Sequence, residues 1–217
     1  MLKLAIFDMD GLMLDSERIY LEEAKKVSDT YHYHIPKEAI LATMGLNSAA
    51  SHQKIIDYMG KDFPIDEYLE HLRKGFEYRL MHREVAKKKG LMELLQYLDE
   101  HHILKAVATS TKRIRAEAML KNANIYDRFD CIVCGNEIAN SKPAPDIYQK
   151  VLKNMGISCR EAVVFEDSRN GLLSACNADI PCILVPDLAI VEEELQKRAL
   201  AVVKDLSKAI DILDDIY

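Results

Sequence analysis

Short apolar runs alternate with helical patterns along most of the chain. In the helical patterns, apolar residues recur three or four positions apart, which places them on one face of a helix. The apolar runs lie at residues 2–7, 103–108, 131–134, 162–165 and 182–185. The helical patterns in the second part of the chain cover about 91–101, 112–123, 145–155, 169–177 and 206–216. This alternation predicts a doubly wound α/β fold, in which a parallel sheet carries helices on both faces.

Residues 16–83 differ from the rest of the chain, because they contain helical patterns and no convincing strand. Helices are expected at about 16–27, 37–44, 49–59 and 64–81, with breaks at Gly45 and Gly60. We therefore expect an all-helical domain at residues 16–83, inserted into an α/β core domain formed by residues 1–15 and 84–217. The chain would leave and re-enter the core near residues 11–17 and 82–90.

The composition indicates an ordinary water-soluble protein. Of the 217 residues, 49% are hydrophobic and 29% are charged, so neither a disordered nor a fibrous class is favoured. The formal net charge of −6 argues against nucleic acid or an anionic membrane as the main partner. No apolar run reaches the roughly 20 residues that span a bilayer. Asp8 and Asp10 interrupt the first run before a signal-peptide core could form, so we expect a cytoplasmic protein.

The five cysteines favour reduced thiols over disulfides, since their number is odd and no export signal is visible. Cys131 and Cys134 form a C-x-x-C pair, but both lie on a predicted strand. No second Cys/His pair at zinc spacing lies nearby. We interpret the two cysteines as small buried side chains of the sheet.

Polar residues follow or flank several of the predicted strands. Because ligands of an open α/β sheet bind beyond the carboxyl ends of its strands, these residues would face a common site. They are Asp8, Asp10, Thr109, Ser110, Lys142, Glu166 and Asp167. The set contains a carboxylate nucleophile, an acid/base, hydroxyl donors, a lysine and a further acidic pair. Phosphoryl transfer through an aspartyl-phosphate would need these groups.

Four short segments resemble the four motifs of the haloacid dehalogenase superfamily. They are Asp8-x-Asp10-Gly11, Thr109 or Ser110, Lys142-Pro143 and Glu166-Asp167. The sequence is most similar to the β-phosphoglucomutase and phosphoglycolate-phosphatase-like branch, through FDMDGLMLDSE at 7–17, SKPAPD at 141–146 and FEDS at 165–168. The resemblance covers nearly the whole chain. It implies a Rossmann-like core with a helical cap inserted after the first motif, a description that residues 16–83 fit.

The resemblance also implies catalytic roles by position. Asp8 would attack the phosphorus, and Asp10 would protonate the leaving oxygen and then activate the hydrolytic water. Thr109 or Ser110 would donate a hydrogen bond to a phosphoryl oxygen. Lys142 would offset the negative charge of Asp8 and of the phosphate.

A Mg²⁺ ion is a further implication of the resemblance. Its ligands would be the Asp8 carboxylate, the Asp10 backbone carbonyl and Asp167, with Glu166 contributing directly or through water. Oxygen ligands of this kind suit Mg²⁺, and the cation lets one anion approach another. Glu166 has an alternative, purely structural interpretation, in which it holds Lys142 in place.

Phosphatase and phosphomutase activities are both compatible with these motifs, whereas the second aspartate argues against dehalogenase chemistry. Phosphomutases of this branch carry an arginine in the cap loop and a histidine shortly after the first motif. The matching places here hold Gly45-Leu46-Asn47-Ser48 and Tyr20. A bis-phosphorylated intermediate needs a cation in the cap to hold its distal phosphate. We therefore predict a phosphatase.

The expected substrate is a small phosphorylated metabolite, a sugar phosphate foremost, and the expected form of the protein is a monomer. Phosphomutase activity is the first alternative. Binding of a phosphorylated metabolite without catalysis is the second. The candidate substrate-binding residues are Ser110, Tyr20, Asn47, Ser48, His52, Arg169 and Asn170.

Overall fold

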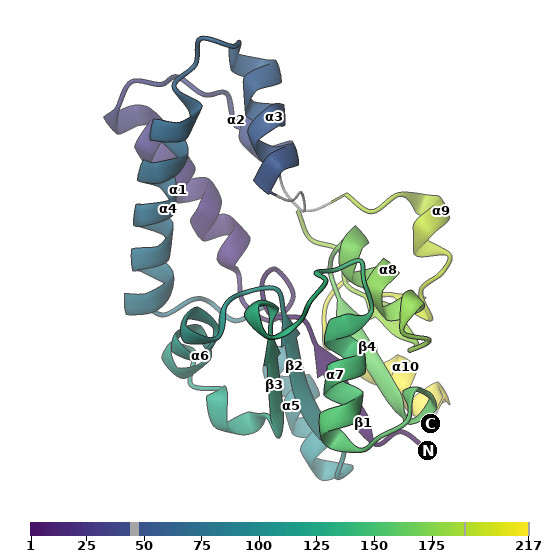
Figure 1. Cartoon of the computed structure of the whole chain (residues 1–217). Helices are drawn as coiled ribbons and strands as arrows, with labels where there is room; N and C mark the ends of the chain where they lie inside the picture. The colour runs from purple at the N-terminus through teal and green to yellow at the C-terminus, as the bar shows by residue number, and fades with distance from the viewer. Residues whose placement is uncertain (44–47, 189, 217) are drawn as a thin grey trace.

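In the described part of the chain, six parallel strands form a central sheet (Figure 1). The structure is a computed structural model that describes residues 1–43, 48–188 and 190–216, and of residues 48, 49 and 216 only the backbone. The strands are β1 (Leu4–Phe7), β2 (Leu104–Thr109), β3 (Cys131–Cys134), β4 (Ala162–Glu166), β5 (Cys182–Leu184) and β6 (Ala201–Val202). Their order across the sheet is β3-β2-β1-β4-β5-β6. The sheet therefore extends in both directions from β1, and the predicted doubly wound topology is confirmed.

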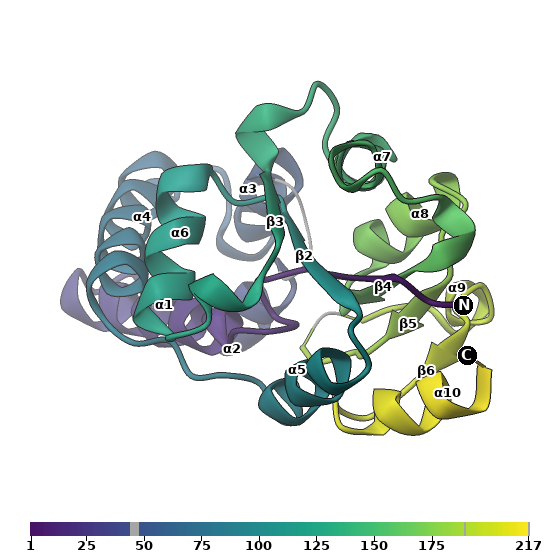
Figure 2. The ribbon, with the colours of Figure 1, turned by 90° about the horizontal axis from the view of Figure 1, so that it is seen from below.

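Helices cover both faces of the sheet (Figure 2). Successive residues of strand β1 face opposite sides of the sheet, and all four are buried. Ala5 and Phe7 belong to a hydrophobic cluster with α5 (Leu91–Glu100), α6 (Arg113–Asn122) and α10 (Lys208–Ile216). Leu4 and Ile6 belong to a second cluster with α7 (Asp146–Met155), α8 (Arg169–Asn177) and α9 (Glu193–Gln196). Short 3-10 turns lie at Tyr126–Arg128, Gly135–Glu137 and Cys159–Glu161.

Two short elements near the C-terminal edge were not predicted. The four-residue helix α9 and the two-residue strand β6 lie in a stretch where the sequence indicated no element. Segments this short contain less than two periods of any pattern, so their type could not be read from the spacing of apolar residues. The five cysteines are free thiols, and Cys134 is buried, as expected from the sequence, whereas Cys131 is only half-buried.

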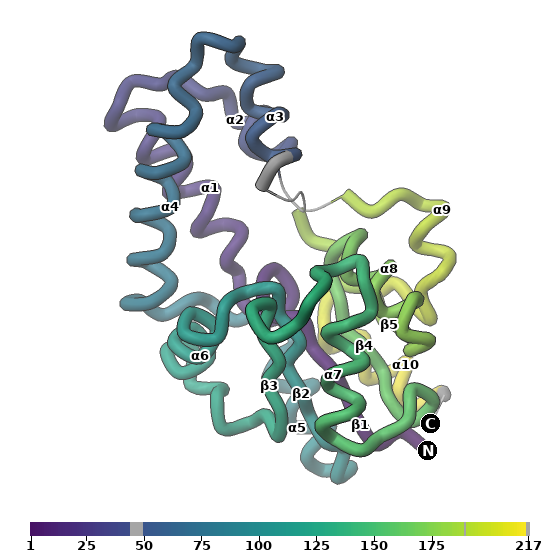
Figure 3. The backbone as a smooth tube through the Cα atoms, in the orientation of Figure 1, coloured from purple at the N-terminus to yellow at the C-terminus, as the bar shows by residue number. Residues whose placement is uncertain are grey.

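Four helices, here named the cap helices, lie beyond the carboxyl ends of the strands (Figure 1). They are α1 (Ser16–Thr30), α2 (Lys37–Leu41), α3 (Ser48–Met59) and α4 (Ile65–His82). Their apolar faces form a third hydrophobic cluster, which contains Val27, Ile40, Ile55, Tyr68 and Leu72. This cluster is separate from the two that cover the sheet. The smooth backbone trace in Figure 3 shows the long helices α1 and α4 side by side, as their contacts require.

The two chain segments that connect the cap helices to the sheet lie next to each other. The backbone N–H of Asp15 donates to the carbonyl oxygen of Ala86 at 2.9 Å, and that of Lys88 donates to the carbonyl oxygen of Met13 at 2.8 Å. Leu14, between them, is fully buried. Beyond this paired connection, the cap helices also contact the α/β part where α4 packs on α6. Among the described residues, none of the helices combines the length and apolar character that crossing a membrane requires.

Candidate active site

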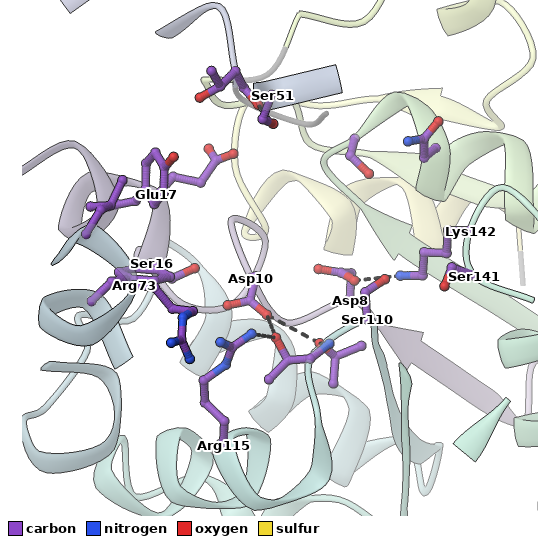
Figure 4. Close-up of a pocket in the computed structure, with 18 of the residues that line it drawn as sticks. Asp8, Asp10, Ser16, Glu17, Ser51, Arg73, Ser110, Arg115, Ser141 and Lys142 are labelled. Atoms are coloured by element: carbon purple, nitrogen blue, oxygen red, sulfur yellow. Dashed lines mark hydrogen bonds and ion pairs between the residues drawn. The ribbon is translucent and has the colours of Figure 1, made fainter. Parts of the chain in front are cut away.

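A cavity of about 1080 Å³ lies between the cap helices and the carboxyl ends of the central strands. Figure 4 shows side chains from both sides pointing into it. The α/β part contributes Asp8, Asp10, Thr109, Ser110, Lys142 and Asp167, and the cap helices contribute Tyr20, Ser51, Arg73 and Phe76. Residues far apart in the sequence thus meet where the strand order reverses, the usual position of a ligand site in a doubly wound sheet.

Asp8 is held at the end of strand β1 by the sheet itself. Its backbone N–H donates to the carbonyl oxygen of Phe165 in β4, at 3.1 Å, and so continues the strand pairing. The Asp8 side chain is 11% exposed, and its Oδ1 lies 2.6 Å from Nζ of Lys142. Because Lys142 occupies Oδ1, a ligand in the cavity would meet Oδ2.

Lys142 uses all three hydrogens of its ammonium group within the protein. The acceptors are Asp8 Oδ1 and Glu166 Oε1, each at 2.6 Å, and the carbonyl oxygen of Ala108, at 2.9 Å. Burial alone would lower the pKa of Lys142, but the two carboxylates raise it above its usual value. The ammonium group therefore stays charged and fixed, and it offsets negative charge at Asp8.

Glu166, at the end of β4, is completely buried and uses both carboxylate oxygens inside the protein. Its Oε1 accepts from Lys142 and from the Tyr148 hydroxyl, at 2.7 Å. Its Oε2 accepts from the backbone N–H of Asp167 and from the N–H and hydroxyl of Ser168. Burial would raise the pKa of Glu166, but Lys142 and the hydrogen bonds keep it below its usual value. This supports the structural interpretation of Glu166, and its part in metal binding stays a prediction.

Asp167 is buried against the loop that leaves β1. A β-carbon on Gly11 would lie 2.1 Å from Asp167 Oδ2, and Gly11 has a φ of +86°. The close approach and the left-handed backbone both favour glycine at this position. Gly11 therefore lets the backbone of the first motif pass directly beside the Asp167 carboxylate.

Three buried carboxylates of the site lie close enough to share a cation. Oxygens of Asp8, Glu166 and Asp167 lie within 4.8 Å of one another. Burial, together with repulsion by Glu166 and Asp10, raises the pKa of Asp8 to about 7, although Lys142 opposes the shift. Burial and its acidic neighbours raise the pKa of Asp167 well above its ordinary value. One lysine does not balance three carboxylates, and oxygen donors are those that Mg²⁺ prefers, so the residues present fit a divalent metal ion.

Asp10 is held by two hydroxyl groups from the loop after β2. Its Oδ2 accepts from Thr111 Oγ1, at 2.8 Å, and from Thr109 Oγ1, at 3.3 Å. Thr111 was not among the residues predicted from the sequence. Strand β2 ends at Thr109, so Thr111 lies in the loop beyond it and the alternation of strand residues gave no signal for its position.

Three of the predicted substrate-binding residues line the cavity. They are Ser110, Tyr20 and Asn170. Tyr20 also packs edge-on against Phe76, with ring centroids 5.4 Å apart, which orients it on the cap side of the cavity. A substrate could reach all three side chains, and their contact with it stays a prediction.

The other four predicted residues were Asn47, Ser48, His52 and Arg169. In the described part of the chain, the lining of the cavity includes neither His52 nor Arg169, and Nε of Arg169 pairs with Glu192 at 3.3 Å. Asn47 and the side chain of Ser48 lie outside the described residues.

The cavity also contains a cation from the cap helices that the sequence did not indicate. Arg73 of α4 lines it, as does Arg115 of α6 (Figure 4). Glu77 of α4 lies 3.8 Å from Arg73 and 3.9 Å from Arg115. The argument against a phosphomutase considered only residues 45–48 and Tyr20, and Arg73 reaches the cavity from a different part of the cap helices. The face of α4 that borders the cavity depends on its packing against α1, which the sequence pattern did not specify.

Replacement of Lys142 by methionine is expected to lower the free energy of unfolding by about 3 kcal/mol, because it leaves buried carboxylates without their counter-charge. Urea unfolding in the presence of a chelator measures the change. The control is Lys197→Met, which removes an exposed ion pair with the same 2.6 Å distance, to Glu194. That variant should lose less than about 1 kcal/mol. Equal losses in the two variants would contradict the account of the buried site.

The chain belongs to the family of haloacid dehalogenase-like hydrolases, because the model of that family matches residues 5–185. This confirms the resemblance found in the motifs at residues 8–11, 109–110, 142–143 and 166–167. The match includes the whole region of the cap helices and ends just after β5.

Individual proteins and solved structures are also similar to this chain over most of its length. Phosphorylated carbohydrates phosphatase of Thermotoga maritima is 30% identical over 204 residues, which cover 92% of this chain and 93% of the relative. The structure of CbbY from Rhodobacter sphaeroides in complex with phosphate matches with a TM-score of 0.74 and 23% identity over 96% of each chain. β-Phosphoglucomutase from Clostridium difficile matches with a TM-score of 0.74 and 19% identity, over 99% of this chain and 96% of that one. The two structures establish the fold alone, whereas the family and the relatives named as phosphatases define this chain as a phosphoric monoester hydrolase.

Proposed function

We propose that the protein is a Mg²⁺-dependent phosphatase that hydrolyses a small sugar phosphate through an aspartyl-phosphate on Asp8. The observation that carries this proposal is the Asp8 carboxylate at the end of β1, bonded through one oxygen to Lys142 and open through the other to the cavity. The relative named for phosphorylated carbohydrates supports the sugar class of substrate.

In the first proposed step, Oδ2 of Asp8 attacks the phosphorus while the bond between phosphorus and the leaving oxygen breaks. Lys142 remains bonded to Oδ1 and disperses the negative charge that gathers on the carboxylate and the phosphoryl group. Asp10 gives its proton to the leaving oxygen, so the product departs as an alcohol. Thr109 or Ser110 donates a hydrogen bond to a phosphoryl oxygen, and Thr109 would have to release its 3.3 Å hydrogen bond to Asp10 to do so.

In the second proposed step, Asp10 takes a proton from a water molecule while the water oxygen attacks the phosphorus. The bond between phosphorus and Asp8 breaks, inorganic phosphate leaves, and both carboxylates return to their starting states. Mg²⁺ would be held by the Asp8 carboxylate, the Asp10 backbone carbonyl and Asp167, where it would offset the repulsion between the carboxylates and the phosphate.

We also propose that residues 16–83 act as a cap domain on a core of residues 1–15 and 84–217. The separate hydrophobic cluster of the cap helices and the paired connection at residues 13–15 and 86–88 support this division. Closure of such a cap would exclude bulk water from the reacting groups. A monomeric, cytoplasmic enzyme that binds neither nucleic acid nor membranes remains the prediction of the composition.

Phosphomutase activity is the second candidate function, because Arg73 supplies a cation on the cap side of the cavity. The fold shared with a β-phosphoglucomutase is compatible with it. Binding of a phosphorylated metabolite without turnover remains the third.

A substrate screen separates these functions. With Mg²⁺ and a panel of phosphorylated metabolites, the protein is expected to release inorganic phosphate, most rapidly from a sugar phosphate. With β-glucose 1-phosphate and glucose 1,6-bisphosphate, it should release at least about tenfold more phosphate than it forms glucose 6-phosphate, since hydrolysis needs only water as acceptor. Dominant isomerisation would favour the mutase, and no turnover of any compound would favour the binding protein.

A further inference from the structure

A chain of hydrogen bonds leads from Asp10 away from the reacting groups. Asp10 Oδ2 accepts from Thr111 Oγ1 at 2.8 Å, and Thr111 Oγ1 accepts from NH2 of Arg115 at 3.1 Å (Figure 4). Thr111 is buried, and the Arg115 side chain is 28% exposed. Asp10 is therefore linked to Arg115 on helix α6 through the Thr111 hydroxyl.

The direction of these hydrogen bonds follows from the groups involved. A guanidinium group only donates, so the Thr111 hydroxyl must accept from Arg115. A hydroxyl has one hydrogen, and that of Thr111 is then directed at Asp10 Oδ2. Thr109 behaves in the same way, because its Oγ1 accepts from the backbone N–H of Thr111 at 3.0 Å and lies 3.3 Å from Asp10 Oδ2. Two donors thus converge on one oxygen of Asp10, and the other oxygen is left for exchange of a proton with a ligand.

Arg115 also connects this network to the cap helices. Its NH1 lies 3.9 Å from Glu77 Oε1 on α4, and α4 packs directly on α6. The guanidinium is therefore fixed on one side by a residue of the cap helices and on the other by Thr111. One charged group thus contacts both α4 and the Thr111 hydroxyl that donates to Asp10.

We propose that Thr111 and Arg115 are positioning residues for Asp10, which orient its carboxylate so that Oδ1 faces the leaving oxygen of the substrate. The proposal rests on the proposed phosphatase function. Because Asp10 protonates the leaving oxygen, its orientation matters most when the leaving group is a poor one. A purely structural role of Thr111 would affect good and poor leaving groups alike.

The test compares p-nitrophenyl phosphate, which has a good leaving group, with phenyl phosphate, which has a poorer one, both with Mg²⁺. Thr111→Val keeps the shape of the side chain and removes the hydroxyl. It should lower kcat/KM, which reports transfer to Asp8 and not the later hydrolysis, by about 100-fold for phenyl phosphate and by no more than about threefold for p-nitrophenyl phosphate. Arg115→Met should show the same selectivity with about a tenfold loss for phenyl phosphate.

Two further variants serve as controls. Thr111→Ser retains the hydroxyl and should keep kcat/KM for phenyl phosphate within about threefold of the unmodified protein. Lys112→Met removes one positive charge from an exposed neighbour of Thr111 and should leave both rates unchanged. If Thr111→Val does not fold, Arg115→Met and Thr111→Ser carry the comparison.

The outcomes distinguish this inference from the function on which it rests. Equal losses of kcat/KM for the two substrates would overturn the positioning role while the phosphatase function stands. Failure of the unmodified protein to release phosphate from the aryl phosphates and from every compound of the metabolite panel would overturn both.

Discussion

Asp8→Asn is expected to lower kcat for phosphomonoester hydrolysis by about 10⁴-fold or more, because an amide oxygen is a far weaker nucleophile than a carboxylate. Asparagine has nearly the same shape as aspartate, and its oxygen can still accept from Lys142, whose Nζ lies 2.6 Å from Asp8 Oδ1. Replacing one of three clustered carboxylates by a neutral group should leave the thermal stability unchanged or higher. Steady-state hydrolysis of p-nitrophenyl phosphate and the Tm report the two effects.

The control for this variant is Asp127→Asn, which makes the same chemical change at an exposed position in the turn at Tyr126–Arg128. Its activity should equal that of the unmodified protein. If Asp8→Asn kept more than about a tenth of the activity, Asp8 could not be the nucleophile, because the catalytic contribution of that group would be too small.

Removal of divalent metal with a chelator is expected to lower kcat by about 10³-fold, and added Mg²⁺ should restore it. The reason is electrostatic: Asp8, Glu166 and Asp167 lie within 4.8 Å of one another, and a phosphate dianion must approach the same place. Burial, with repulsion by Glu166 and Asp10, raises the pKa of Asp8 to about 7, which means that the carboxylate is poorly stabilised without a further cation. Hydrolysis of p-nitrophenyl phosphate, assayed before and after dialysis against EDTA, measures the effect.

Metal binding itself has a readout that does not depend on turnover. Mg²⁺ at a hundred times its Kd should add about 2.7 kcal/mol to the free energy of unfolding, observed as a rise in Tm. Asp167→Asn should abolish most of that rise, whereas Asp127→Asn should keep it. Full activity in EDTA, or the same rise in Tm with Asp167→Asn, would contradict the metal site.

The sheet and its order of helices could be predicted because the relevant patterns are local. Strand β1 is a run of residues buried on both faces, and the polar residues that follow it end the run at the site itself. The same holds for β2 and β4, which end at Thr109 and Glu166. Parallel strands bring their carboxyl ends to one edge, so the residues that follow them could be assigned to a common site before any contact was known.

The partners of these residues could not be predicted, since they depend on how separate elements pack. Tyr148 has the spacing of a core residue on α7, yet its hydroxyl bonds Glu166. Arg73 has the spacing of an exposed residue on α4, yet it borders the cavity. The bond between Thr111 and Asp10 requires the loop after β2 to meet the loop after β1, and no periodic pattern specifies a loop conformation.

The central claim is that the phosphoryl group passes through Asp8, and trapping that intermediate tests it most directly. Asp10→Asn should slow the second step, which needs a base, more than transfer from p-nitrophenyl phosphate, whose leaving group needs little acid assistance. Acid quenching of this variant during turnover with Mg²⁺, followed by borohydride reduction and peptide mass spectrometry, is expected to reveal homoserine at position 8. The double variant Asp8→Asn, Asp10→Asn should give no such product. Phosphate release without any modification of Asp8, or modification of a different residue, would contradict the account.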